Sequence, residues 1–131
     1  MKYLVPFSVL KNSIRLQSVK GQLKVDMNYD ELLDMLKRML QAVQVEDVWY
    51  RKTYPDVDDA IRGGAYRDAK HHFVENGYFE GRKPFPLEIN EDWYLQTYPD
   101  VKTGIEEGLL TTARDHFEQH GYDEGRLPVQ F

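Results

Sequence analysis

Apolar and polar residues alternate in two short segments near the N-terminus. Residues 14–17 and 23–26 place apolar side chains at every second position, and Lys20-Gly21 lies between the two segments. A period of two around a glycine-containing turn predicts a β-hairpin. Over residues 29–43 the apolar spacing changes to three and four, which predicts an amphipathic helix. Its apolar positions are Leu32, Leu33, Leu36, Met39, Leu40 and Val43.

From residue 45 onward the chain is a tandem repeat. Residues 45–87 align with residues 89–131 at a constant offset of 44, without gaps, with 18 identities over 43 positions. Such a period marks a repeat architecture in which units bury apolar faces on one another. Because an open solenoid normally needs three or more copies, we expect a small closed pair with the N-terminal segment as its lid. One compact domain would then comprise a cap (1–44), repeat 1 (45–88) and repeat 2 (89–131).

Each repeat has the signals of three helices. The first is expected to begin at Asp47. The second is expected to cover residues 55–62, because Pro55 suits a first helical turn and Gly63-Gly64 suits a helix end. With Thr53 as its N-cap, Asp56 falls at the capping-box position. The third is expected over residues 66–76 and should end at a glycine. The equivalent signals in the second copy are Asn90, Thr97, Asp100 and a third helix over 112–120. The predicted class is therefore mainly α: two tandem three-helix repeats with an N-terminal β-hairpin and helix.

Several polar residues recur at the same place in both copies, and we interpret them as a structural repeat signature. Glu80 and Arg82 flank a turn glycine, as do Glu124 and Arg126, and an ion pair that fixes the loop is the simplest interpretation. His72 and His116 are expected to hydrogen-bond from the core. Asp56 and Asp100 are the first-turn acids described above.

A metal site at these histidines is an alternative interpretation. His116 and His120 are one helical turn apart, and His71-His72 is the matching place in the first copy. His120 is Asn76 in the other copy, however, and the chain has no cysteine and no zinc-protease helix motif. We therefore predict no metal and no cofactor.

The repeated Trp-Tyr pairs leave two interpretations open. Trp49, Tyr50, Trp93 and Tyr94 can form a stacking platform that contacts a sugar or a partner, or they can belong to the core. The sequence has neither a nucleophile-elbow signature nor a phosphate-cradling glycine loop. We therefore predict that the protein is not an enzyme.

Composition narrows the classes of partner. The net charge of −5, from 22 acidic and 17 basic residues spread along the chain, argues against nucleic acid. No stretch approaches the ~20 apolar residues of a membrane span, and the N-terminal apolar run is too short for a signal peptide. Because cysteine is absent, the fold must hold by packing alone. We expect a soluble cytoplasmic protein that begins at Met1.

The order of motifs over residues 45–131 resembles a known bacterial repeat. Both copies carry W-Y-x-x-x-Y-P-D-V, then H-F, then G-x-x-E-G-R-x-P. The repeat it resembles is found beside or within glycosyltransferases of envelope-polysaccharide synthesis and in secreted calcium-repeat proteins. One departure is that Asp68-Ala69 and Thr112-Ala113 stand where that repeat usually has Pro-Leu.

What the resemblance implies is an accessory or interaction module rather than a catalyst. The expected partner is another protein, of surface-polysaccharide synthesis, and the alternative is a carbohydrate-binding module that uses the Trp-Tyr pairs. Since an isolated pair of strands is marginal in water, the N-terminal segment is also expected to form a homodimer.

Overall fold

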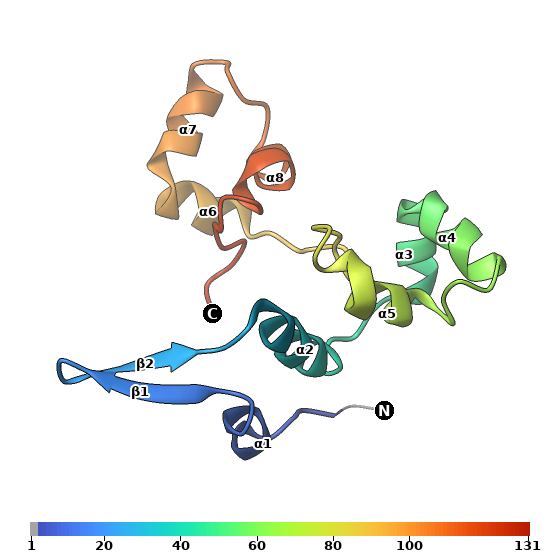
Figure 1. Ribbon diagram of the computed structural model, residues 1–131. Helices are drawn as coiled ribbons and strands as arrows, with labels where there is room; N and C mark the ends of the chain where they lie inside the picture. Colours follow the sequence, from blue (N-terminus) through green and yellow to red (C-terminus); the bar gives the residue numbers. More distant parts are fainter. Residues whose placement is uncertain (1–2) are drawn as a thin grey trace. The chain divides into compact units, whose positions relative to one another are not determined.

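The computed structural model describes residues 3–131 and shows a mainly α fold with one two-stranded antiparallel sheet, which confirms the predicted class. The chain divides into two compact units, Met1–Phe85 and Pro86–Phe131. The first unit contains α1 (Phe7–Lys11), β1 (Arg15–Val19), β2 (Gln22–Asp26), α2 (Tyr29–Leu40), α3 (Asp47–Thr53), α4 (Pro55–Arg62), α5 (Ala69–His72) and the π-helical segment η1 (Phe73–Gly77) (Figure 1). The second contains α6 (Glu91–Thr97), α7 (Pro99–Glu106), α8 (Ala113–His116) and the π-helical segment η2 (Phe117–Gly121).

The N-terminal segment forms the predicted hairpin and helix. β1 and β2 are joined by Lys20 and Gly21, which have φ of 50° and 78°, the two positive values that a type I′ turn requires. α2 begins at the predicted residue and ends at Leu40, three residues early, because the chain continues as a turn in which Val43 N–H donates to the Leu40 carbonyl. α1 was not predicted. It is one short turn that follows Pro6, too short for a periodic pattern to show.

In each repeat a single tyrosine separates the first two helices. Tyr54 lies between α3 and α4 with φ −121° and ψ 80°, because the residue before a proline avoids the helical region. Thr53 is the last residue of α3, so the prediction that it caps α4 is wrong, as is the same prediction for Thr97 at the end of α6. The capping box with Asp56 therefore does not form. The predicted bounds of α4, 55–62, are confirmed.

The third helix of each repeat is shorter than predicted at its start and changes type before its end. Asp68 caps α5 by accepting a hydrogen bond from the His71 N–H, and Thr112 does the same at α8. After His72 the helix widens to a π-turn, in which Tyr78 N–H donates to the Phe73 carbonyl at 2.9 Å. The segment ends at Gly77, as predicted.

Each unit has its own hydrophobic core. The buried core of the first unit consists of Leu40, Tyr50, Val57, Ala69, Phe73 and Val74, so α2 contributes to it. The buried core of the second unit consists of Tyr94, Val101, Ala113 and Phe117. The predicted closed pairing of the two repeats stays a prediction. None of the helices within residues 3–131 combines the length and the apolarity needed to cross a bilayer.

The two ends of each repeat are hydrogen-bonded to each other. The Glu46 N–H donates to the Pro84 carbonyl at 3.0 Å, and the Asn90 N–H donates to the Pro128 carbonyl at the same distance. The recurrent proline at the end of the motif therefore meets the residue before the first helix. In each repeat these hydrogen bonds hold the start and the end of the chain segment together.

Candidate functional site

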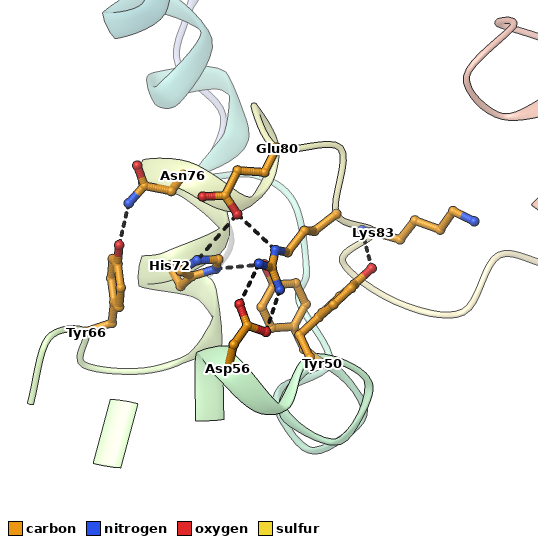
Figure 2. A network of polar contacts seen from close by, with 9 residues as sticks. Tyr50, Asp56, Tyr66, His72, Asn76, Glu80 and Lys83 are labelled. Atoms are coloured by element: carbon orange, nitrogen blue, oxygen red, sulfur yellow. Dashed lines mark hydrogen bonds and ion pairs between the residues drawn. The ribbon is translucent and has the colours of Figure 1, made fainter. Parts of the chain in front are cut away.

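The centre of each repeat is a buried tyrosine–histidine pair. In the first copy the Tyr50 hydroxyl lies 2.9 Å from His72 Nδ1, and the two residues are 0% and 5% exposed (Figure 2). Gly77 borders this pair. A Cβ atom at Gly77 would lie 2.2 Å from the Tyr50 hydroxyl oxygen, so the glycine is required by close approach. The π-turn thus brings a bare backbone against the hydroxyl.

Arg82 connects the loop after η1 to the start of α4. Its two terminal nitrogens donate to the two carboxylate oxygens of Asp56 at 2.9 and 2.6 Å, and its Nε donates to Glu80 at 2.9 Å. The guanidinium also lies over the Tyr54 ring, 4.9 Å from its centroid. The Tyr54 hydroxyl in turn accepts the Lys83 backbone N–H at 3.0 Å. Together with the buried pair, these contacts form what we term the signature network.

The second copy reproduces the signature network almost atom for atom. The Tyr94 hydroxyl lies 2.8 Å from His116 Nδ1. Arg126 donates to Asp100 at 2.9 and 2.8 Å and to Glu124 at 2.7 Å. The corresponding tyrosine and glycine contacts are those of Tyr98 and Gly121. Two sequences that differ at most positions therefore build one arrangement, which indicates that the shared residues are the ones it needs.

Burial sets the protonation of the pair. It lowers the pKa of His72 and raises the pKa of Tyr50, and it shifts His116 and Tyr94 in the same directions. Both rings are therefore neutral at neutral pH, and the tyrosine O–H can donate to an unprotonated Nδ1. At the surface, the hydrogen bond from Arg82 holds the pKa of the Asp56 carboxyl below its usual range.

We predict that stability falls as pH drops below about 6.5, the usual pKa of an exposed histidine. Since the folded-state pKa of His72 and His116 is depressed, the unfolded chain binds more protons in this window, and folding loses free energy as pH falls. Thermal unfolding followed by circular dichroism between pH 8 and 5 measures the effect. His72→Gln with His116→Gln should flatten the profile. His71→Gln with His120→Gln should keep a fall in stability, because the buried histidines His72 and His116 remain. A profile that keeps its full slope in the variant without His72 and His116 would contradict the assignment.

The predicted site residues divide into buried and half-buried positions. Tyr50 and Tyr94 are fully buried, so of the two Trp-Tyr pairs only the half-buried indoles of Trp49 and Trp93 reach the surface. The predicted pairing of Glu80 with Arg82 is present, and the structure adds Asp56 and Tyr54 to it. The roles of Tyr54 and Gly77 were missed, although their identity in both copies was a signal that could have identified them.

The histidines considered as a metal site do not meet a third ligand within the described residues. The rings of His116 and His120 lie with their centroids 5.8 Å apart. Across residues 3–131, no group of three or more histidine, aspartate or glutamate side chains converges in a way that could hold a metal ion. His116 is instead engaged with Tyr94.

An open groove lies at the same place in both repeats, beside the first two helices. The groove at α6 and α7 has a volume of about 460 Å³ and is lined by Asp92, Leu95, Gln96, Pro99 and Lys102. The groove at α3 and α4 has a volume of about 390 Å³ and is lined by Asp47, Val48, Arg51, Lys52, Asp58 and Arg62. Under the offset of 44, four equivalent positions line the groove of each copy, and each carries a different residue in the two copies. These positions are Val48 and Asp92, Arg51 and Leu95, Lys52 and Gln96, and Asp58 and Lys102.

The two linings differ in chemistry. In the first groove Asp58 accepts from Arg51 at 2.6 Å and pairs with Arg62 at 3.0 Å, so ion pairs occupy its wall. In the second groove the positions of Arg51 and Asp58 are taken by Leu95 and Lys102.

In the described part of the chain every buried side-chain nitrogen and oxygen has a hydrogen-bond partner, so the signature network has no unsatisfied group aimed at a ligand. Comparison of the chain with protein-family models, with curated proteins and with solved structures finds no match.

Proposed function

We propose that this protein is a non-catalytic interaction module in which two copies of one framework present two different grooves to a partner protein. One observation carries the proposal. The residues that are identical in the two copies build the signature network, whereas the four equivalent positions that line the groove of each copy differ between the copies. If both grooves bound the same small ligand, their linings would be expected to match. Different linings on one framework suit two different parts of a larger partner.

The setting we propose is bacterial surface-polysaccharide synthesis. Support comes from the resemblance of residues 45–131 to a repeat found beside glycosyltransferases of that pathway. The partner is then another protein of the same machinery, and the proposed location is the cytoplasm. The proposal assigns no cofactor and no catalytic residue.

Affinity capture with a groove variant tests the proposal. Leu95→Arg with Lys102→Asp gives the second groove the ion pair that the first already contains between Arg51 and Asp58, so the fold should tolerate it. We expect this variant to lose a polysaccharide-synthesis protein that the wild type captures from native extract. Leu109→Asp, at a residue that is 75% exposed and outside both linings, is the matched control and should retain it. Equal capture by all three proteins would contradict the role of the groove.

Carbohydrate binding is a second candidate, which one observation favours. Trp49 and Trp93 are half-buried at equivalent positions, each in edge contact with a tyrosine at 6.3 Å between ring centroids. Partly exposed indole faces can stack on sugars. Tryptophan fluorescence titrated with polysaccharide fragments separates the two functions: a saturable change that Trp93→Ala abolishes would favour the carbohydrate-binding module.

We further propose that the N-terminal segment joins two copies of the chain. Of residues 3–44, Val5 and Leu40 alone are buried. Among residues 3–131, ten of the sixteen exposed large hydrophobic residues lie between residues 3 and 40, although this segment is less than a third of the chain. Exposed apolar surface concentrated in one segment marks an interaction site.

A further inference from the structure

The hairpin presents one apolar and one polar face, and both are exposed. Leu16 is paired with Val25, and Leu23 follows on the same face, whereas the other face carries Gln17 and Lys24. All ten strand residues are exposed, and the side chains of Leu23 and Val25 are 74% and 56% exposed. Two strands alone are marginally stable in water, while three or more with an apolar face can be stable. The hairpin therefore has the apolar face of a stable sheet but too few strands to form one.

Its outer edges are free for pairing. Among residues 3–131 the sheet has two strands, so each has one edge without a strand neighbour. Counted from the two-residue turn, the alternation of an antiparallel ladder makes Val19–Gln22 and Gln17–Lys24 the hydrogen-bonded pairs. The N–H and C=O groups of Leu23 and Val25 consequently point to the free edge of β2. A strand added there must pair with these two residues.

The charges of β2 suit a second copy of itself. β2 carries both Lys24 and Asp26, whereas β1 has Arg15 as its one charged residue. An antiparallel pair of β2 strands centred on Val25 places Lys24 opposite Asp26 of the second copy, twice by symmetry. Centring on Lys24 would oppose the two lysines, and centring on Leu23 would place Lys24 opposite Gln22.

From this charge complementarity we infer that two copies of the chain join through antiparallel pairing of their β2 strands, centred on Val25. The inference rests on the proposed self-association of the N-terminal segment and adds its register. Paired residues of an antiparallel ladder point to the same face, so the two hairpins form a four-stranded sheet with one continuous apolar side. Leu16, Leu23 and Val25 of both copies lie on that side.

Single cysteines test the register, because the chain has no cysteine of its own. Across a hydrogen-bonded pair the Cα atoms are about 5.5 Å apart, within disulfide range, so mild oxidation of Val25→Cys should give a covalent species of twice 15.5 kDa. Leu23→Cys should stay uncrosslinked, since its two copies would be ~13 Å apart along the ladder. Lys24→Cys should also stay uncrosslinked at about 7–8 Å.

The outcomes separate the register from self-association. Cross-linking by Leu23→Cys or Lys24→Cys but not by Val25→Cys overturns the register. A light-scattering mass of twice 15.5 kDa for the wild type, without cross-linking of Val25→Cys, overturns it too and leaves self-association intact. A single 15.5 kDa species at high concentration overturns both.

A charge exchange provides an independent test. Lys24→Asp places like charges opposite each other twice and should raise the dimer dissociation constant by about 10-fold. Asp26→Lys should act in the same direction. The double exchange Lys24→Asp with Asp26→Lys restores both opposite-charge pairs and should bring the constant back toward that of the wild type. Additive weakening in the double variant would overturn the proposed pairing.

Discussion

Replacement of Phe117 by alanine is expected to unfold the second unit while residues 1–85 stay folded. Phe117 is 1% exposed in the core formed by Tyr94, Val101 and Ala113. Removal of a buried phenylalanine ring costs about 3–5 kcal/mol. A unit of 46 residues, from Pro86 to Phe131, is expected to have a stability of roughly 2–7 kcal/mol. The loss is therefore comparable to the whole stability of the unit.

Hydrogen exchange read by mass spectrometry measures this unit by unit. Peptides from the second unit should lose protection in Phe117→Ala, and those from the first should keep it. Phe73→Ala is the matched variant, because Phe73 occupies the same position in the first repeat and is 2% exposed. It should produce the reverse pattern. Loss of protection in both units with either variant would show one cooperative core instead of two.

Gly77→Ala is expected to destabilise the first unit by several kcal/mol. The added Cβ atom would lie 2.2 Å from the Tyr50 hydroxyl, which cannot retreat because its ring is fully buried. Overpacking of a core costs about 1–3 kcal/mol, and breaking the hydrogen bond to His72 adds about 1–3 kcal/mol. Urea unfolding followed by circular dichroism gives the change in the free energy of unfolding.

A double-mutant cycle identifies the cause of that loss. Tyr50→Phe removes the oxygen atom that the new methyl group would meet, so Gly77→Ala should cost less in the Tyr50→Phe background. Gly121→Ala, with its contact of 2.3 Å to Tyr94, should repeat the result in the second unit. Strictly additive costs would show that the close approach to the hydroxyl is not the reason for the glycine.

Local patterns predicted the elements whose signals lie within a few residues. The hairpin followed from period-two alternation around Lys20-Gly21, and α4 followed from Pro55 at its start and Gly63-Gly64 at its end. The capping prediction failed because the proline, not the threonine, decides the junction. Tyr54 precedes the proline and is excluded from helical geometry, so the boundary falls one residue after Thr53.

The signature network was predictable only in part, because most of its contacts span the fold. Glu80 and Arg82 are two residues apart, and their pairing could be inferred from spacing. The contact of Arg82 with Asp56 joins residues 26 positions apart, and Tyr50 meets His72 across 22. Helix packing makes these contacts, and no periodicity encodes them. The π-turn at Phe73 was equally hidden, since its apolar spacing matches that of an ordinary helix.

The hydrogen bond between the two ends of each repeat bears on how such proteins change over generations. Every partner in the signature network lies within the same 44 positions, and the backbone leaves a repeat next to where it entered. A duplicated stretch of gene therefore encodes a unit whose signature network is complete without a neighbouring unit. The number of repeats can then change during evolution. Each new copy can diverge at the residues that line its groove while it keeps the framework that shapes the groove.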